Sequence, residues 1–367
     1  MNVAEKTNFE KIFKKAPRLE GYSYSIAEAL KARNNKNILS IRLETSLRCN
    51  ARCIYCCNRS GKALTNELSY DKLIELILEA KALKARSVVV IGGGEPTIYP
   101  QFRDLISFIF QNNLIPVIFT NTQTITKDLA SFLFNNNVSV ITKLDSLNEE
   151  IQDKMIGIKD GSKKIMEGLN YLIEAGYTKN LKNSSIYKLG ASFVVNRINA
   201  TTIPDVWRFC RDNNIFPNLE MMVPNEKGKE MNDYLLSREE CKTLKLNLLE
   251  IDRNEYGFNW LPYTPIPASG CFQVLYNMYI TVRGIVRPCS SIHFDGPTVH
   301  NYSLKEILDT QYFQAARNCE KNLKGKCKKC EYLKECIGCR GISFAYAKNN
   351  GVDYFEALVS EDPTCFK

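Results

Sequence analysis

Two kinds of hydrophobic pattern alternate along the first two thirds of the chain. Short runs rich in branched apolar residues predict strands that are buried on both faces, whereas apolar residues spaced three and four positions apart predict helices. The predicted strands cover residues 38–45, 87–91, 116–120, 138–143, 189–195 and 219–223. The predicted helices cover residues 69–83, 102–110, 127–134, 162–175 and 203–213, and Ser69 is suited to cap the first of them.

The regular alternation of strands and helices favours an α/β fold with a parallel sheet. Six strand–helix units suit a partial (β/α)6 TIM-like barrel better than a closed barrel of eight. The rhythm changes after residue 224, where a helix over 237–252 and a proline-rich stretch over 261–267 are predicted. The predicted organisation is an N-terminal extension (1–38), the partial barrel (39–235), a helix and linker (236–269) and a small cysteine-rich C-terminal domain (270–367).

The composition is that of an ordinary globular protein, with 44% hydrophobic and 24% charged residues. No apolar stretch reaches the roughly 18 residues of a membrane span, and the polar N-terminus has no signal-peptide core, so we expect a cytoplasmic location. The formal net charge of +9 is typical of a solvated surface. The alternative is attraction to an acidic partner, such as a reductase or an acidic peptide. No motif that combines basic and stacking residues supports nucleic-acid binding.

The chain has 14 cysteines and only two histidines, His293 and His300. In a reducing compartment, clustered cysteines favour metal binding over disulfides. The shortage of histidine excludes a histidine-rich metal site and argues against zinc–water catalysis. Most of the cysteines near the C-terminus lie in sequence with little apolar content, so we expect bound metal to help hold that region together.

Three cysteines, Cys49, Cys53 and Cys56, follow the first predicted strand at C-x3-C-x2-C spacing. Thiolates this close can bind three corners of a cuboidal iron–sulfur cluster and leave the fourth iron open for chemistry. One alternative is a structural zinc site, which usually takes four local ligands in C-x2-C pairs. The other is a chance cluster of buried cysteines. Cys57 is too close to its neighbour to serve well as a fourth ligand.

A glycine run, Gly92 to Gly94, ends the second predicted strand and is followed by Glu95 and Pro96. Glycine allows the backbone to approach a ligand closely. A phosphate-binding loop is one alternative, but no Gly-Lys-Ser/Thr follows, and a tight strand-to-helix turn is the other. Alone, the glycine run is only a weak indication of a ligand-binding loop. It becomes informative because it lies about 36 residues after the cysteine loop.

Together, the cysteine loop and the Gly-Gly-Glu-Pro element resemble the radical S-adenosylmethionine (radical SAM) enzymes. The resemblance covers about residues 40–225. It implies a 4Fe-4S cluster on Cys49, Cys53 and Cys56, with S-adenosylmethionine (SAM) bound to its open iron. It also implies that SAM is reductively cleaved to a 5′-deoxyadenosyl radical, which abstracts a hydrogen atom from a substrate.

The same resemblance implies specific SAM contacts. Tyr55 would pack near the adenine, and the backbone at Gly93 and Gly94, with Glu95, would receive the methionine amino group. Two further pairs of residues follow later strands, where polar side chains would face the ribose or the carboxylate. Asp145 or Ser146 would bind the ribose, and Asn196 and Arg197 would contact the carboxylate. A loop cap or a solvated loop is the alternative for each of these four.

A second group of cysteines lies in the last hundred residues, and consists of Cys271, Cys289, Cys327, Cys330, Cys336, Cys339 and Cys365. Their arrangement resembles the SPASM domain, a C-terminal extension of some radical SAM enzymes that holds auxiliary 4Fe-4S clusters. By this resemblance, a first auxiliary cluster would be bound by Cys271, Cys289 and Cys339. A second would be bound by Cys327, Cys330, Cys336 and Cys365. A zinc ribbon on the C-x2-C pairs is the alternative, and it leaves three cysteines without a role.

Two features depart from the usual SPASM pattern. Only two residues separate Cys336 from Cys339, where the family usually has three, and no further cysteine lies between Cys271 and Cys289. The first auxiliary cluster would therefore have an open iron, or would recruit Cys319 or a ligand other than cysteine.

These motifs predict a radical SAM oxidoreductase or maturase, with a flavodoxin or ferredoxin as electron donor. The predicted substrate is a peptide or protein that is oxidised, cross-linked or epimerised. The alternative is a small molecule, such as an amino sugar or a cofactor precursor, that is dehydrogenated or epimerised. Only about 40 residues precede the first predicted strand, too few for a separate leader-binding domain at that end, which weakens the peptide hypothesis. A non-catalytic electron-transfer protein would not explain the Gly-Gly-Glu-Pro element.

Overall fold

The six predicted strands form one parallel sheet. In spatial order they are β2 (Ser40–Leu43), β3 (Ser87–Val90), β4 (Ile115–Thr120), β5 (Ser139–Lys143), β7 (Leu189–Val195) and β8 (Phe216–Met221). The computed structural model describes residues 13–179, 181 and 184–367, so residues 1–12 of the predicted N-terminal extension lie outside the described residues. Every predicted strand overlaps an observed one, and the largest shift is in β8, which begins at Phe216 rather than at residue 219.

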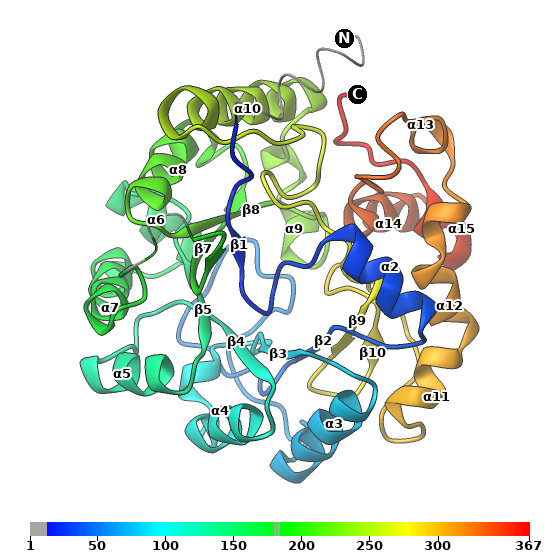
Figure 1. The fold of residues 1–367 in the computed structure, drawn as a ribbon, viewed down its shortest axis with the longest axis horizontal. Coiled ribbons are helices and arrows are strands. Elements are labelled where there is room, and N and C mark those ends of the chain that lie inside the picture. The colour runs from blue at the N-terminus through cyan, green and yellow to red at the C-terminus, as the bar shows by residue number, and fades with distance from the viewer. Residues whose placement is uncertain (1–12, 180, 182–183) are drawn as a thin grey trace.

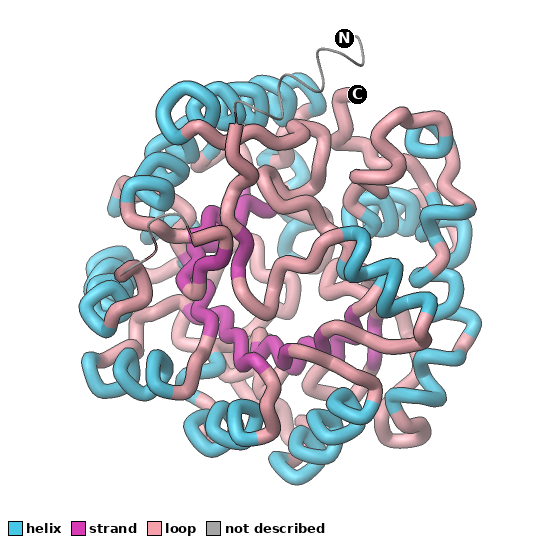
Figure 2. The backbone as a smooth tube through the Cα atoms, in the orientation of Figure 1, coloured by secondary structure: helices cyan, strands magenta, loops and turns pink. Residues whose placement is uncertain are grey.

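Helices lie on the outside of this sheet (Figure 1). Those that connect successive strands are α3 (Tyr70–Ala82), α4 (Phe102–Gln111), α5 (Lys127–Asn135), α6 (Glu149–Ile156), α7 (Gly161–Ala175) and α8 (Ile203–Asp212). Figure 2 shows the strands as a curved arc inside the helices. The arc is open, because its two edge strands do not pair with each other. A curved parallel sheet that does not close is the predicted partial barrel.

The two faces of the sheet carry two separate cores, because successive side chains of a strand point to opposite faces. Outward residues such as Ile41 and Val88 pack with the helices in the main hydrophobic cluster. Inward residues such as Val117 and Ile141 form a smaller cluster with Leu19 and Tyr22 of the N-terminal segment. In that segment, β1 (Arg18–Leu19) pairs with β6 (Ile186–Tyr187) and crosses the sheet in Figure 1. The N-terminal segment therefore covers one end of the barrel interior.

The sheet continues into the cysteine-rich region, which the sequence did not predict. β9 (Asn277–Ile280) pairs in parallel with β2, and β10 (Val286–Arg287) pairs antiparallel with β9. The neighbouring helices are α2 (Ile26–Asn34), α9 (Lys227–Glu230), α10 (Arg238–Ile251), α11 (Leu304–Asp309), α12 (Gln311–Arg317), α13 (Gly325–Lys328), α14 (Arg340–Asn349) and α15 (Tyr354–Val359). The strand β9 thus belongs to the barrel sheet although it lies within the predicted C-terminal domain.

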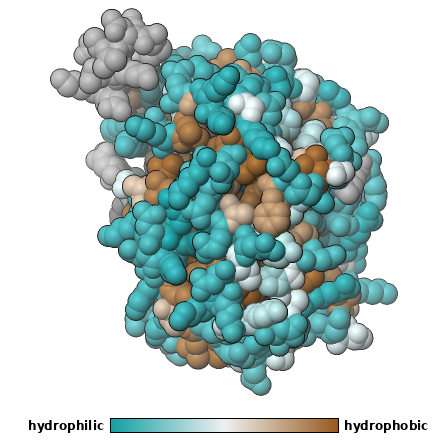
Figure 3. All heavy atoms as spheres, turned by 90° about the vertical axis from the view of Figure 1, so that its right-hand side faces the viewer, coloured by the Kyte–Doolittle hydropathy of each residue, from teal (hydrophilic) through white to brown (hydrophobic). Residues whose placement is uncertain are grey.

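The C-terminal region has an apolar core of its own, so the expectation of little apolar content was wrong. Buried residues of α2, α12, α14 and α15 pack with Phe272, Leu275 and Phe344 in one hydrophobic cluster. The apolar residues are spread over short helices, which hid the pattern in the sequence. The face of the molecule at the right of Figure 1 is mainly hydrophilic, with separate hydrophobic groups (Figure 3). Within the described residues, no helix has both the length and the apolar character needed to cross a membrane.

Candidate functional site

One cavity of about 320 Å3 extends into the interior of the barrel. Its wall includes three segments that the sequence singled out, namely the cysteine loop, the glycine run and part of the C-terminal cysteine group. The predicted ligands on this wall are Cys49, Cys53, Cys56, Cys271, Cys289 and Cys339. Tyr55, Gly93, Gly94 and Glu95 also line it. The fold therefore places the two predicted cysteine sites on the wall of one cavity.

The cysteine loop is held by backbone hydrogen bonds to the end of α6. The amide of Arg52 donates to the carbonyl of Ile156 (2.9 Å), and the amide of Ile54 donates to the carbonyl of Met155 (3.1 Å). Gly157 follows α6 with φ +66°, and a Cβ there would collide with the carbonyl oxygen of Arg52. The loop therefore keeps its shape through contacts with a helix that lies far away in the sequence.

The glycine run packs directly against the segment that leads into the cysteine loop. Gly94 donates its amide to Ser46 (2.8 Å), and Glu95 donates its amide to Arg48 (2.9 Å). A Cβ on Gly94 would collide with the carbonyl oxygen of Arg48, and Gly93 has φ +75°. Glycine is therefore required here by the close approach of two backbone segments as well as by any ligand.

Glu95 ties together the ends of two strands. Its buried carboxylate accepts hydrogen bonds from the Thr120 hydroxyl (2.7 Å), the Asn121 amide (2.7 Å) and the Thr97 hydroxyl (2.6 Å). Burial raises the pKa of Glu95, and the hydrogen bonds act in the opposite direction. The side chain of Asn121 in turn donates to Asn50 in the cysteine loop (2.7 Å). Glu95 thus lies on the cavity wall but already has protein partners.

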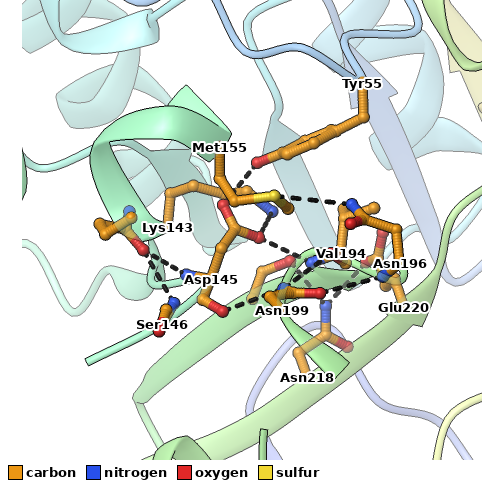
Figure 4. Close-up of polar contacts among 12 residues, drawn as sticks. Tyr55, Lys143, Asp145, Ser146, Met155, Val194, Asn196, Asn199, Asn218 and Glu220 are labelled. Atoms are coloured by element: carbon orange, nitrogen blue, oxygen red, sulfur yellow. Dashed lines mark hydrogen bonds and ion pairs between the residues drawn. The ribbon is translucent and has the colours of Figure 1, made fainter. Parts of the chain in front are cut away.

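Tyr55 is anchored by a carboxylate and a cation from β5 and the residues that follow it (Figure 4). Its hydroxyl donates to Asp145 (2.6 Å), and the Lys143 Nζ lies 4.8 Å from the centre of its ring. Lys143 also forms an ion pair with Asp145 (3.1 Å). Asp145 is fully buried and accepts a further bond from the amide of Val194 (2.8 Å). Asp145 therefore positions Tyr55, which lines the cavity, while Asp145 itself does not.

The structure does not bring the other predicted ribose and carboxylate contacts to the cavity wall. Ser146 accepts a bond from the Asn148 amide (3.1 Å) and lines a second cavity beside α6 and α7. Asn196 is buried and accepts from the Ile198 amide (2.9 Å). Arg197 is exposed and pairs with Glu240 (2.9 Å). Ser146 and Asn196 each accept a hydrogen bond from a backbone amide of their own loop, as polar residues after a strand often do. Arg197 instead forms an ion pair at the surface.

Sequence reasoning missed several polar residues that line the cavity from within the strands, namely Arg42, Thr142, Ser192 and Glu220. Arg42, Ser192 and Glu220 are inward-facing members of β2, β7 and β8, in runs that are otherwise mainly apolar. For these three, the available signal was the period-two alternation, which puts one polar residue on the inner face of each strand. Thr142 follows the inward-facing Ile141 in β5 and donates its hydroxyl to the carbonyl of Gly190 (3.2 Å). Lys143, the last residue of β5, also lines the cavity.

The C-terminal cysteines divide into two groups. Burial, with a smaller contribution from Cys289, raises the pKa of Cys271 to about 12. Burial also raises the pKa of Cys339, to which Cys271 and Cys289 both contribute. All three thiols line the same cavity wall. The first predicted auxiliary set is therefore brought together.

The remaining C-terminal cysteines, Cys327, Cys330, Cys336 and Cys365, do not line the cavity. Burial raises the pKa of Cys336 to about 11, with further contributions from Cys365 and Cys327. Gly338, with φ +68°, lies between Cys336, which is off the cavity wall, and Cys339, which is on it. Cys319 belongs to neither group, because it is fully buried in the apolar C-terminal cluster and does not line the cavity.

The donor chemistry fits iron–sulfur clusters better than a single metal ion. In the part of the chain that the structure describes, no three Cys, His, Asp or Glu side chains converge as ligands of one ion would. Each thiolate of a cuboidal cluster binds a different iron, so such convergence is not required. Burial raises the pKa of Cys49 to about 11 and that of Cys53 to about 12. The free thiols would therefore hold their protons at neutral pH and release them when metal binds.

Comparison with known proteins supports the same assignment. Residues 43–189 match the radical SAM superfamily, and residues 271–331 match the SPASM iron–sulfur cluster-binding domain. The chain is 22% identical over 358 residues to an AdoMet-dependent heme synthase from Methanosarcina barkeri, covering 89% of this chain and 95% of that protein.

Solved structures share the fold at low sequence identity. The Streptococcus suis protein SuiB, bound to S-adenosylmethionine, superposes with a TM-score of 0.68 at 18% identity, covering 93% of this chain and 80% of that one. The structure of anSMEcpe with bound AdoMet and the Cp18Cys peptide gives a TM-score of 0.66 at 17% identity, covering 87% of this chain and 94% of that one. The α/β partial barrel with a C-terminal domain is thereby confirmed. The chain is a radical SAM superfamily enzyme with a C-terminal SPASM domain, and its cofactors are SAM and 4Fe-4S clusters.

Proposed function

We propose that this enzyme removes a hydrogen atom from a small polar molecule held in the barrel cavity, leading to dehydrogenation or epimerisation. The observation that carries this proposal is the shared cavity wall, which includes Cys49, Cys53 and Cys56 as well as Cys271, Cys289 and Cys339. A substrate in this space would lie between the two predicted cluster sites. The radical chemistry itself follows from the family.

The proposed roles at the SAM end of the cavity follow the loop geometry. Cys49, Cys53 and Cys56 would ligate the SAM-binding cluster, and when bound, SAM and this cluster supply the radical. The backbone at Gly93 and Gly94 would approach the SAM amino acid moiety. Tyr55 would pack against the adenine, and its hydrogen bond to Asp145 would fix the orientation of the ring.

The proposed roles at the other end concern the C-terminal domain. Cys271, Cys289 and Cys339 would hold one auxiliary cluster, which leaves one iron without a cysteine ligand. Cys327, Cys330, Cys336 and Cys365 would hold a second. Cys319 is an unsuitable extra ligand for the first cluster because it is buried in the separate apolar core. We also propose a flavodoxin or ferredoxin as electron donor, since the net charge of +9 favours an acidic partner.

The small-molecule substrate is favoured by the size and chemistry of the cavity. Its volume of about 320 Å3 lies within the range of small-molecule sites. Bound SAM and the clusters would occupy part of it, which leaves room for a small substrate rather than a large one. The cavity wall mixes apolar residues with Ser192, Glu220 and Asn225, which suit a substrate with several polar groups. The M. barkeri relative matched over nearly its whole length is named for heme synthesis, which is also small-molecule chemistry. A peptide side chain is the second candidate, because both structural relatives described above include forms solved with peptides.

The test uses SAM cleavage as the readout of substrate binding. Anaerobically reconstituted and reduced enzyme is incubated with SAM and a low-molecular-mass cell extract, with and without protease treatment, and 5′-deoxyadenosine is quantified. Stimulation that survives protease treatment is expected, and stimulation that protease destroys would establish the peptide candidate instead. Cys53→Ala should abolish 5′-deoxyadenosine formation. Correctly loaded enzyme that never forms 5′-deoxyadenosine would refute the proposal.

A further inference from the structure

Arg42 is a buried cation in the wall of the barrel cavity. Its side chain comes from β2, and the residue is only 4% exposed. Among the described residues, its Nε has no hydrogen-bond partner. The guanidinium carbon lies 4.9 Å from the ring centre of Tyr22. Arg211, another buried arginine, is instead paired with the carboxylate of Asp252 at 2.7 Å.

Strand pairing sets Arg42 beside the C-terminal cysteine segment. Arg42 is directly opposite Tyr279 of β9, and the amide of Leu39 donates to the carbonyl of Tyr276 (3.0 Å). β9 lies in the stretch of chain between Cys271 and Cys289. Both cysteines share the cavity wall with Arg42. Each is also close enough to interact with its charge, because Arg42 lowers the pKa of Cys271 and Cys289 raises that of Arg42.

The Arg42 guanidinium has a hydrogen bond to Tyr22, but no described carboxylate forms an ion pair with it. A buried cation without an anionic partner needs a counter-charge, because burial of an isolated charge is costly. A 4Fe-4S cluster with thiolate ligands carries net negative charge, which increases by one on reduction. We propose that Arg42 is the counter-charge of the auxiliary cluster on Cys271, Cys289 and Cys339, and that it makes this cluster easier to reduce. The inference rests on the proposed function, since it assumes that these three cysteines hold a cluster.

Replacing Glu220 tests the inference, because the expected shift in reduction potential is opposite to that of replacing Arg42. It lines the same cavity from β8, and it acts on the pKa of Cys271 in the direction opposite to Arg42. Its carboxylate accepts a hydrogen bond from Asn218 at 2.7 Å. If local charge controls the cluster, removing the cation and removing the anion must shift the reduction potential in opposite directions. A general disturbance of packing has no reason to do so.

An anionic substrate is the other partner that a cavity arginine could have. The cluster is favoured because Arg42 is almost completely covered, lies over an aromatic ring and is joined by strand pairing to the segment that carries Cys271 and Cys289. A substrate must exchange with solvent at each turnover, whereas a resident cluster provides a permanent counter-charge. Substrate binding at Arg42 is therefore treated as an outcome of the test.

The experiment is a redox titration of reconstituted enzyme followed by electron paramagnetic resonance. A Cys49→Ala, Cys53→Ala and Cys56→Ala background removes the signal of the SAM-binding site, and the signal lost on adding Cys339→Ala identifies the cluster in question. In Arg42→Met, the reduced-to-oxidised ratio at a fixed potential is expected to fall about tenfold, a shift of about 59 mV for a one-electron couple. Arg42→Lys should retain most of the wild-type value, and Glu220→Gln should shift it the opposite way.

Arg317→Met is the control for loss of a buried arginine, because Arg317 is 2% exposed and lies outside the cavity wall. It is expected to leave the potential unchanged. An unchanged potential in Arg42→Met, or the same direction of shift in Glu220→Gln, would overturn the inference while the proposed function stands. Arg42→Met is also made in enzyme that keeps Cys49, Cys53 and Cys56. If the potential is unchanged but stimulation of SAM cleavage by the active extract fraction is lost in that enzyme, Arg42 binds substrate instead. Absence of any signal that depends on Cys339 would refute the proposed auxiliary site itself.

Discussion

The two cysteine groups on the cavity wall are built in different ways. Cys49, Cys53 and Cys56 belong to a single loop, so their proximity is largely a local property of the chain. Cys271, Cys289 and Cys339 come from separate segments, and they reach one cavity wall in a region where β9 joins the barrel sheet. A local site can be recognised from spacing, whereas a dispersed site depends on the packing of the whole C-terminal region.

The supports of the two sites differ in the same way. The cysteine loop is held by backbone hydrogen bonds to α6 and by the close approach of the glycine run. The dispersed site is held by an apolar cluster that unites α2, α12, α14 and α15. Changes at the local site should therefore have confined effects on SAM chemistry, and changes at the dispersed site should leave SAM cleavage intact. Four predictions test this difference.

The largest effect is expected when one cysteine is replaced in each site, because the two variants should lose different steps of the reaction. Cys53→Ala should abolish SAM cleavage and remove about four irons per chain, the content of one 4Fe-4S cluster. Cys339→Ala should remove a similar amount of iron and abolish substrate conversion while SAM is still cleaved. Iron analysis and chromatography of 5′-deoxyadenosine measure both. Cys319→Ala is the control and should keep all the iron; if it loses a cluster, Cys319 is a ligand after all.

A smaller effect is expected when the glycine run is altered. Gly94→Ala places a methyl group against the carbonyl oxygen of Arg48, which should cost about 1–3 kcal/mol of stability by overpacking. Displacement of the loop should weaken SAM binding about tenfold or more, since tenfold in affinity corresponds to about 1.4 kcal/mol. Equilibrium dialysis with labelled SAM measures the change.

Gly351→Ala is the matched control for the glycine run. Gly351 has φ +79° but open space around its Cβ position, so alanine there tests backbone strain without a collision. This variant should lose about 1 kcal/mol of stability and bind SAM normally. Equal loss of SAM affinity in both variants would show that the close approach at Gly94 is unimportant.

The third prediction concerns the pH dependence of stability at Glu95. Burial raises its pKa above the ordinary value of 4.5, so the folded protein binds more protons than the unfolded chain above that pH. The free energy of unfolding should therefore fall as pH rises from 4.5 through the raised pKa, by about 1.4 kcal/mol for each unit of the shift. Denaturant unfolding of metal-free protein should show a flatter pH profile for Glu95→Gln. Identical profiles would indicate an ordinary pKa.

The smallest effect is expected at Arg197, which the sequence assigns to the SAM carboxylate. Its guanidinium is exposed and already paired with Glu240, so Arg197→Ala should change stability and SAM affinity little. Lys242→Ala, which removes another exposed cation of an ion pair, is the comparison. A marked loss of SAM affinity in Arg197→Ala alone would mean that the side chain leaves Glu240 and reaches the cavity.

Much of the barrel could be predicted because its pattern is local. Branched runs and amphipathic segments gave all six parallel strands and the helices between them, apart from α6. The C-terminal helices were missed because they are short and share one dispersed core. β9 was missed because four residues carry no clear pattern, and only pairing with β2 makes them a strand.

In the candidate site, too, some features follow from local sequence and others from long-range contacts. The spacing of Cys49, Cys53 and Cys56 and the glycine run after β3 determined the radical SAM chemistry, since neighbouring residues on a loop are close in any fold. The direction of side chains after the strands was decided by tertiary contacts, which turn Asp145 toward Tyr55 and Arg197 toward Glu240. Only the folded sheet could place Arg42 beside the segment of Cys271, because strand pairing joins parts of the chain that the sequence keeps far apart.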